Sequence, residues 1–260
     1  MDNFKHKKSL GQNFLKDKGI LSKIKNSVDV NSDDLIIEIG PGQGALTKYL
    51  KEFGTQILCF EIDERVKPYL DQIEDDLTKV IYGDFLRVNI KEKLKEYKYN
   101  NIYVIANLPY YITTPIITSI IDSGVDVKEM VFMVQDEVAN RFTSNPGVKD
   151  YGSITVYFNY YFDIEKLFIV NRKCFDPVPG VDSAIIKFKE KLSPIKSNNE
   201  ELFFKLVKNS FMHKRKNIRN NLYMYDLEKI NEVLMRRGFD LTCRAEQLSL
   251  EIFVDISNSL

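Results

Sequence analysis

Residues 35–45 read LIIEIGPGQGA, an apolar run followed by a turn that contains three glycines. The run Leu35–Ile39 has the length and β-branched composition of a buried strand, and Ala45–Phe53 carries apolar residues at helical spacing. Glycines between a strand and a helix permit positive φ and let the backbone approach a ligand closely. This spacing also fits dinucleotide-binding turns, so the stretch predicts a nucleotide site without separating nicotinamide enzymes from other nucleotide binders.

Strand-like and helical segments alternate over residues 35–135, which predicts an α/β fold with a mostly parallel sheet. The expected strands are Leu35–Ile39, Gln56–Phe60, Lys79–Tyr82, Ile102–Ala106 and Met130–Val134, and the expected helices are Ala45–Phe53, Val66–Ile73 and Ile116–Ile121. Two further apolar runs, Phe162–Val170 and Ser183–Phe188, flank a proline-rich turn and predict an antiparallel pair at the sheet edge.

The strand pattern ends near Leu192–Asn199, a polar segment with the composition of a linker. Helical periodicity follows in Phe203–Phe211, Asp226–Met235 and Leu248–Ile256. We therefore expect an α/β domain with a basic N-terminal segment over residues 1–197 and a small all-α domain over residues 198–260.

Polar side chains follow three of the expected strands. Glu61 comes after the second strand, where a carboxylate can bridge the two hydroxyls of a ribose. Asp84 follows the third, where a carboxylate could accept from an adenine amino group, and Asn107 follows the fourth. Either acid alone could simply face solvent. Together with the glycine turn, the ordered set resembles the class I S-adenosylmethionine-dependent methyltransferases, whose fold is Rossmann-like, whereas a dinucleotide enzyme predicts no special group after the fourth strand.

Asn107 opens the sequence Asn107-Leu108-Pro109-Tyr110. Read alone, this is a strand end with a turn. In its context it resembles the motif of methyltransferases that act on planar amino groups. An adenine amine is a poor nucleophile because its lone pair is delocalised. The Asn107 carbonyl and a backbone carbonyl of the Leu108–Pro109 turn could accept both amine hydrogens and aim the lone pair at a methyl group, while Tyr110 stacks on the base.

Further motifs along nearly the whole chain resemble the Ksg-type ribosomal RNA adenine dimethyltransferases. They are Lys7–Leu15, Glu38–Gly44, Asn107–Pro115, Phe132–Gln135 with Glu137–Ala139, Phe175–Ala184, Lys214–Leu222 and Arg244–Leu248. The resemblance implies transfer of four methyl groups, two to N6 of each of two adjacent adenosines near the 3′ end of small-subunit (16S) rRNA. It also implies a role in the maturation of that ribosomal subunit.

The resemblance also implies roles for individual residues. It places the contacts to S-adenosylmethionine on Asn13, Leu15, Gly40, Glu61, Asp84 and Asn107, and Gly42 lies in the same turn. Phe175 would form a second aromatic wall for the target base, held by a turn that Pro177 and Pro179 stiffen; the alternative is an ordinary core aromatic. At Asp136 the chain departs from the family, which more often has lysine there, and this removes one positive charge from a surface that the resemblance places near RNA.

Two alternatives to this function stay open. The related macrolide-resistance methyltransferases act on one adenosine of large-subunit rRNA and share the Asn-x-Pro-Tyr chemistry. A ribosome-assembly or transcription factor could also keep the fold without the activity. The segments Gln135–Ala139 and Val181–Ala184 favour the Ksg type over the first, and the intact set of site residues argues against the second.

The bulk composition sets limits on partners and setting. The chain has 37 basic and 37 acidic residues, so RNA affinity must come from local patches. We expect these in Lys5, Lys7 and Lys8 and in Lys214, Arg215, Lys216 and Arg219. The three cysteines are dispersed, which argues for a reducing environment and against a zinc site. The two histidines are far apart in the sequence and suggest no metal cluster. The sequence has no run that resembles a signal peptide or a membrane span, so we expect a cytoplasmic protein. We also expect it to be monomeric when it is not bound to the ribosome.

Overall fold

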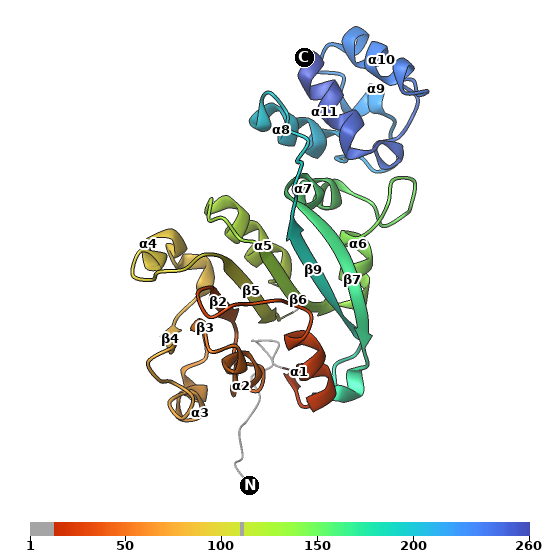
Figure 1. The fold of residues 1–260 in the computed structure, drawn as a ribbon. Coiled ribbons are helices and arrows are strands. Elements are labelled where there is room, and N and C mark those ends of the chain that lie inside the picture. The colour runs from red at the N-terminus through yellow and green to blue at the C-terminus, as the bar shows by residue number, and fades with distance from the viewer. Residues whose placement is uncertain (1–12, 110–111) are drawn as a thin grey trace. The chain divides into compact units, whose positions relative to one another are not determined.

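The computed structural model describes residues 13–109 and 112–260 (Figure 1). The described chain divides into two compact units. An α/β unit comprises the residues up to Ala139 together with Glu165–Lys189, and a helical unit comprises Asn140–Ile164 with Glu190–Leu260. The helical unit therefore takes in residues 140–164, which the sequence assigned to the first domain. The reason is packing: buried residues of this segment belong to the core of the helical unit.

Within the described residues, seven strands form one sheet in the order β4-β3-β2-β5-β6-β9-β7, and β1 pairs with β8 separately. The bounds are β1 Phe14–Leu15, β2 Leu35–Ile39, β3 Gln56–Glu61, β4 Thr78–Tyr82, β5 Ile102–Asn107, β6 Glu129–Gln135, β7 Phe162–Val170, β8 Phe175–Asp176 and β9 Ser183–Glu190. Strands β4, β3, β2, β5 and β6 are parallel, and β9 runs antiparallel to β6. The predicted mostly parallel sheet with an antiparallel edge is confirmed.

Helices cover the sheet and build the second unit. Their bounds are α1 Lys18–Lys25, α2 Thr47–Leu50, α3 Lys67–Leu70, α4 Ile90–Leu94, α5 Thr113–Asp122, α6 Asp136–Phe142, α7 Ser153–Tyr161, α8 Glu200–Ser210, α9 Ile218–Asn221, α10 Leu227–Arg236 and α11 Leu250–Ser259. In Figure 1, α1 and α2 lie on one side of the sheet and α5 on the other. Because both faces are covered, every residue of the central strand β2 is buried, as expected for a parallel sheet.

The register of the parallel strands brings four strand ends together. Ile39 pairs with Phe60 on one side and with Ala106 on the other, and Glu61 pairs with Tyr82. The amide of Gly40 donates to the carbonyl of Phe60 at 2.8 Å. The segments that follow β4, β3, β2 and β5 therefore leave the sheet side by side along one edge, which is where α/β sheets bind ligands.

The helical unit has its own core, built from α7 to α11. Tyr160 stacks on Phe203 with ring centroids 4.8 Å apart, and the Tyr151 hydroxyl donates to the carbonyl of Leu248 at 3.0 Å. Asn199 caps α8, and Asp226 caps α10 by accepting from two backbone amides. The Tyr160 and Tyr151 contacts join α7 and the residues just before it, which are distant in sequence, to the C-terminal helices.

Gly44 fixes the packing at the start of α2. Its φ is +75°, and a Cβ at this position would lie 2.1 Å from Cδ1 of Ile73. Gly54 also has a positive φ, +67°, but a Cβ there would meet open space. The two glycines thus share a backbone requirement and differ in steric surroundings.

We predict that Gly44→Ala destabilises the protein more than Gly54→Ala. Both substitutions bring the cost of a left-handed alanine, roughly 1–2 kcal/mol, but Gly44→Ala adds about 1–3 kcal/mol of overpacking against Ile73. Urea denaturation of both variants measures the difference. Equal losses of stability would show that the Ile73 side chain moves away without cost.

Candidate functional site

A cavity of about 390 Å³ opens at the strand ends of the α/β unit. Its lining is mostly apolar, with a few polar groups, as in typical small-molecule sites. The structure brings most of the predicted catalytic and cofactor-binding residues to this one cavity. Those that line it are Asn13, Leu15, Gly40, Gly42, Glu61, Asp84, Asn107, Leu108 and Pro109.

The glycine turn forms one wall of the cavity. Gly40 and Gly42 have φ of +72° and +56°, values that favour glycine. A Cβ on Gly42 would lie 2.7 Å from Cε1 of Phe14, a cavity-lining residue of β1. The glycine at position 42 therefore leaves room for the Phe14 ring.

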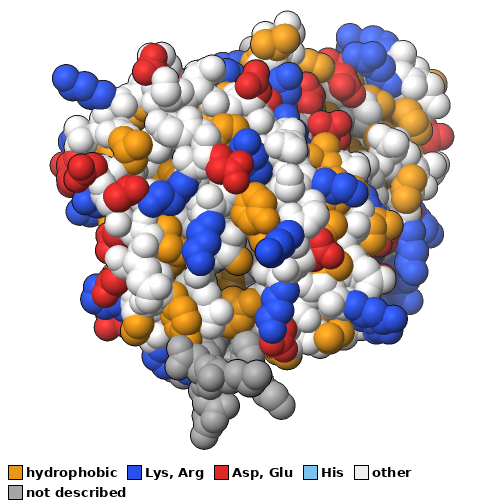
Figure 2. All heavy atoms as spheres, turned by 60° about the horizontal axis from the view of Figure 1, so that its bottom comes forward, with side chains coloured by type: hydrophobic (Ala, Val, Ile, Leu, Met, Phe, Trp, Pro, Cys, Tyr) orange, Lys and Arg blue, Asp and Glu red, His pale blue; other side chains and the backbone are white. Residues whose placement is uncertain are grey.

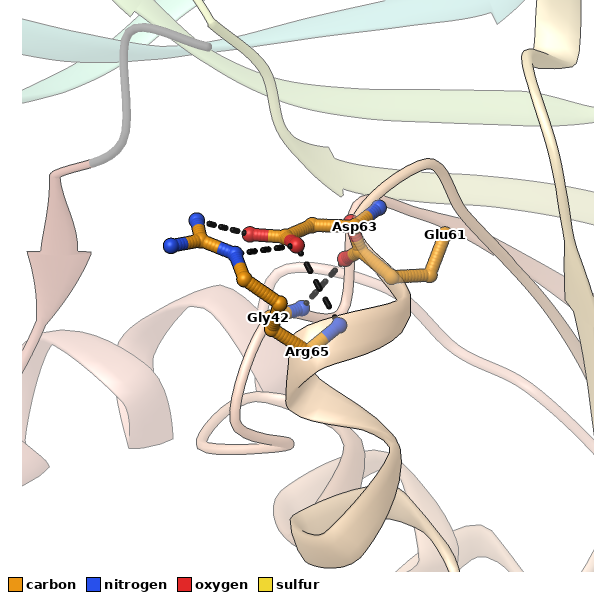
Figure 3. A network of polar contacts seen from close by, with 4 residues as sticks. All are labelled: Gly42, Glu61, Asp63 and Arg65. Atoms are coloured by element: carbon orange, nitrogen blue, oxygen red, sulfur yellow. Dashed lines mark hydrogen bonds and ion pairs between the residues drawn. The ribbon is translucent and has the colours of Figure 1, made fainter. Parts of the chain in front are cut away.

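Glu61 connects this turn to the end of β3 (Figure 3). Its side chain is buried, Oε2 accepts from the Gly42 amide at 2.9 Å, and Oε1 accepts from the Asp63 amide at 2.8 Å. Burial raises the pKa of Glu61, and the two amides oppose that rise by stabilising the charge. Because a carboxylate has about four acceptor positions, both oxygens can still accept from a ligand.

Asp63 and Arg65 hold the segment after β3 and were not identified from the sequence. Asp63 is buried, and the Arg65 guanidinium donates to it from Nε at 2.8 Å and from Nη2 at 2.6 Å (Figure 3). Oδ1 of Asp63 also accepts from the Arg65 amide and so caps the short helix η3, Glu64–Val66. This pair fixes the backbone that donates to Glu61. The only feature of the sequence that could have indicated this ion pair is an acidic residue two positions before an arginine.

Asp84 follows β4 and borders the cavity from the other side. Its Oδ1 accepts from the Leu86 amide at 3.1 Å, capping the short helix η4, Phe85–Arg87. Phe85 packs edge-on against Phe60 with centroids 5.2 Å apart. The cap and this ring contact hold the carboxylate at the cavity.

Asn107 ends β5 in a defined orientation. Its Nδ2 donates to the backbone carbonyl of Asn13 at 3.3 Å. The side-chain oxygen is therefore the end of the amide that can accept from a ligand. Leu108 is buried, and the Pro109 carbonyl accepts from the Ile112 amide at 3.2 Å, which closes the turn.

Phe175 has a different surrounding from the one expected. It pairs with Leu15 between β8 and β1, is 4% exposed, and belongs to a core cluster with Leu15 and Leu21. Within the described chain it is a core residue and does not line the cavity. Sequence could not decide this point, because an aromatic beside prolines suits both positions. Tyr110, expected to stack on the base, lies outside the described residues.

The predicted basic residues fall into two groups. Lys214, Arg215, Lys216 and Arg219 are exposed on the helical unit, and Lys5, Lys7 and Lys8 lie outside the described residues. Asp136 pairs with Lys166 at 2.5 Å. The face drawn in Figure 2 carries both basic and acidic side chains, and hydrophobic side chains are visible in a hollow on it.

Glu38 is a further cavity-lining acid that the sequence analysis did not single out. It is 1% exposed, and the Cys59 thiol donates to its Oε2 at 3.7 Å. Burial raises the pKa of Glu38 to about 7, and the nearby charge of Glu61 adds to the rise. A lone glutamate within an apolar strand was a signal that could have identified it.

In residues 13–109 and 112–260, no three or more His, Cys, Asp or Glu side chains are grouped so that they could hold a metal ion. Across the same residues, no helix is both long and apolar enough to span a membrane.

Comparisons with known proteins point in one direction. The sequence model of a family described as ribosomal RNA adenine dimethylase matches residues 3–260. Relatives named ribosomal RNA small subunit methyltransferase A, from Streptococcus sanguinis (strain SK36) and from Streptococcus pneumoniae serotype 2 (strain D39), are each 42% identical, over 99% of this chain and 92% of their own lengths.

Solved structures show the same fold. A dimethyladenosine transferase from Plasmodium falciparum is 26% identical with a TM-score of 0.74, over 94% of this chain and 95% of that one. The 23S rRNA methyltransferase ErmE is 25% identical with a TM-score of 0.74, over 95% of this chain and 99% of that one. The predicted Rossmann-like methyltransferase fold is confirmed.

We predict that Glu38 makes the stability of the protein depend on pH. Its pKa is about 7 when folded, against 4.5 as the ordinary value, so its stabilising contribution is complete below about pH 4.5 and is lost as pH rises through 7. Relative to Glu38→Gln, the free energy of unfolding of the wild type should fall by roughly 3 kcal/mol as the pH rises over this range.

Urea denaturation at a series of pH values measures the effect. The exposed Glu64 provides a matched control, since Glu64→Gln should leave the pH profile of the wild type unchanged. Parallel profiles for the wild type and Glu38→Gln would contradict the assignment.

Proposed function

The chain belongs to the ribosomal RNA adenine dimethylase family, and from this premise we propose that it dimethylates N6 of two adjacent adenosines near the 3′ end of small-subunit rRNA. The observation that carries the proposal is the arrangement of Gly40, Glu61, Asp84 and Asn107 around one cavity. Each comes from a different strand, and the four strands are adjacent in the sheet. In this proposal the reaction is a step in the maturation of the small ribosomal subunit.

The family and the fold indicate a methyl donor of the S-adenosylmethionine type. The residues present fit this group, because the cavity combines an apolar lining, a glycine turn and the carboxyl groups of Glu38, Glu61 and Asp84. When bound, S-adenosylmethionine supplies an electrophilic methyl group. We assign ribose contacts to Glu61 and the adenine amino contact to Asp84. The glycine turn and the segment Asn13–Leu15 would enclose the remaining parts, and no metal is needed.

The acceptor amine would lie at Asn107. Since the Asn13 carbonyl holds Nδ2 of Asn107, Oδ1 is left to accept one amine hydrogen. The carbonyl of Leu108 would accept the second hydrogen, so the nitrogen lone pair points toward the methyl group. Both carbonyls also stabilise the positive charge that develops on nitrogen, and the proton leaves after transfer.

Two aromatic side chains would form the walls of the base site. Tyr110 would stack on one face of the adenine. Contact of Phe175 with the other face requires its ring to leave the core position beside Leu15. Without that movement, Phe175 acts through β8, which pairs with β1 and so holds Phe14 and Leu15 at the cavity.

The substrate in this proposal is rRNA within an assembling small subunit. Relatives that are 42% identical are named ribosomal RNA small subunit methyltransferase A. The fold does not separate the two substrates, because it is equally similar to a dimethyladenosine transferase and to the 23S rRNA methyltransferase ErmE. The names of the relatives therefore favour the small subunit over the large one. We further propose that the enzyme works in the cytoplasm, where subunits mature, and is monomeric off the ribosome.

We predict that small subunits lacking the modification accept label from S-adenosylmethionine, and that mapping finds dimethyladenosine near the 3′ end of their rRNA. Asn107→Ala should lower the rate at least about 100-fold, because it removes an acceptor aimed at the developing charge. Asn100→Ala is the control, since Asn100 is exposed before β5 and uses its backbone amide to donate to Asp33.

The outcomes separate the alternatives. Label in protein-free large-subunit RNA, with none in small subunits, would overturn the proposal in favour of the macrolide-resistance type. Tight binding to small subunits with no label in either RNA would favour an assembly factor without activity.

We also predict that reversing Lys214, Arg215 and Lys216 to glutamate weakens rRNA binding and leaves S-adenosylmethionine affinity unchanged. Each lost phosphate contact should reduce the slope of log K against log salt by about 0.9. Lys229→Glu with Arg236→Glu, two exposed changes on α10, provides the control. An unchanged slope in the first variant would show that these side chains do not contact phosphates.

A further inference from the structure

Two adjacent apolar side chains are exposed on the helical unit, directly after α9. Tyr223 is 72% exposed and Met224 is 52% exposed. The nearby Tyr225 behaves differently: it packs against the core, and its hydroxyl accepts from Nδ2 of Asn209 at 3.0 Å. Two tyrosines two residues apart thus have different roles, one structural and one presented to solvent.

The exposed ring lies beside a basic loop whose shape is fixed. Asn221 is buried, and its Nδ2 donates to the carbonyls of Ser210 at 2.7 Å, His213 at 3.3 Å and Lys216 at 3.4 Å. These bonds hold the loop between α8 and α9 against the residue two positions before Tyr223. Lys214, Arg215, Lys216 and Arg219 are all exposed in this segment.

The backbone that carries Tyr223 is anchored on both sides. Ile218 and Leu222 are 0% exposed, and the amides of Ile218 and Arg219 donate to the carbonyls of Cys243 and Leu241. The Tyr225 amide donates to the Leu222 carbonyl at 2.9 Å. A ring on a fixed backbone loses little conformational freedom when a ligand covers it.

The charge around the ring indicates the kind of partner. Residues 202–225 contain six lysines and arginines and no acidic residue. The next acid, Asp226, uses Oδ1 to cap α10. An exposed apolar ring on a segment whose charged residues are all basic fits a polyanion with flat apolar groups, which is RNA with accessible bases, better than it fits a neutral protein surface.

We propose that Tyr223 stacks on an unpaired base of RNA while the loop Lys214–Lys216 and Arg219 hold the flanking phosphates. The proposal rests on the proposed function, which makes RNA the partner, and adds a base contact on the helical unit. The base must be unpaired and unstacked, because the faces of bases inside a duplex are already covered. Met224 extends the apolar surface next to the ring.

The chain has no tryptophan, which allows a direct test. In Tyr223→Trp the new indole is the sole tryptophan fluorophore, and stacking on a base should quench it. We expect strong quenching by single-stranded poly(U) and weak quenching by duplex RNA of equal length. Met235→Trp is the matched control: Met235 is 63% exposed at the far end of α10, so quenching there should be small.

Affinity provides the second measurement. Tyr223→Ala should weaken binding of the full chain to single-stranded RNA about 5- to 100-fold at unchanged salt dependence, because stacking is lost and phosphate contacts stay. Tyr223→Phe keeps the ring and should bind within about twofold of the wild type. A Phe variant as weak as the Ala variant would overturn stacking.

Other outcomes are equally decisive. If Tyr223→Trp shows no quenching at RNA concentrations that saturate binding, the base contact does not exist. A response of Tyr223→Trp to whole small subunits but not to their rRNA would mean that a protein covers this surface, which also overturns the proposal. Failure of methylation by the wild type would instead count against the proposed function, so the two failures are distinguishable.

Discussion

The parallel register of β4, β3, β2 and β5 is the constraint on which the site depends. Parallel strands end at one edge, so residues that are 20 or more positions apart in the sequence leave the sheet side by side. The bond from the Gly42 amide to Glu61 then joins two of these ends directly, and the bond from Asn107 to the Asn13 carbonyl joins a third to the N-terminal segment. A shift of one residue in this register would turn each strand-end side chain to the other face.

Two acidic groups of this cavity, Glu61 and Asp84, accept from backbone amides, and Asp84 also pairs with Nε of Arg87 at 3.5 Å. Glu61 accepts from two amides and Asp84 from one, and each amide belongs to a turn that follows a strand. Amides stabilise a carboxylate without placing a full positive charge beside it.

The sequence predicted the parts of the fold that follow from local pattern. Apolar runs bounded by glycine or proline predicted the bounds of β2, β3 and β5 almost to the residue. The polar residues that follow successive strands identified Glu61, Asp84 and Asn107, which line the cavity. It did not predict α7 as part of the helical unit, because that depends on which distant residues Tyr151 and Tyr160 pack against. Nor could it place Phe175, since core burial and a base-facing wall use the same aromatic residue in the same turn.

In the proposed function, the two units of the chain would meet two different demands. Methyl transfer to a weakly nucleophilic amine needs an apolar cavity with a few fixed acceptors, and the α/β unit has such a cavity. Holding RNA needs clustered positive charge, which would be costly to bury. The helical unit exposes that charge on a loop fixed by Asn221, whose single amide group satisfies three carbonyls. A chain with zero net charge can therefore bind a polyanion locally while its reactive cavity stays largely apolar.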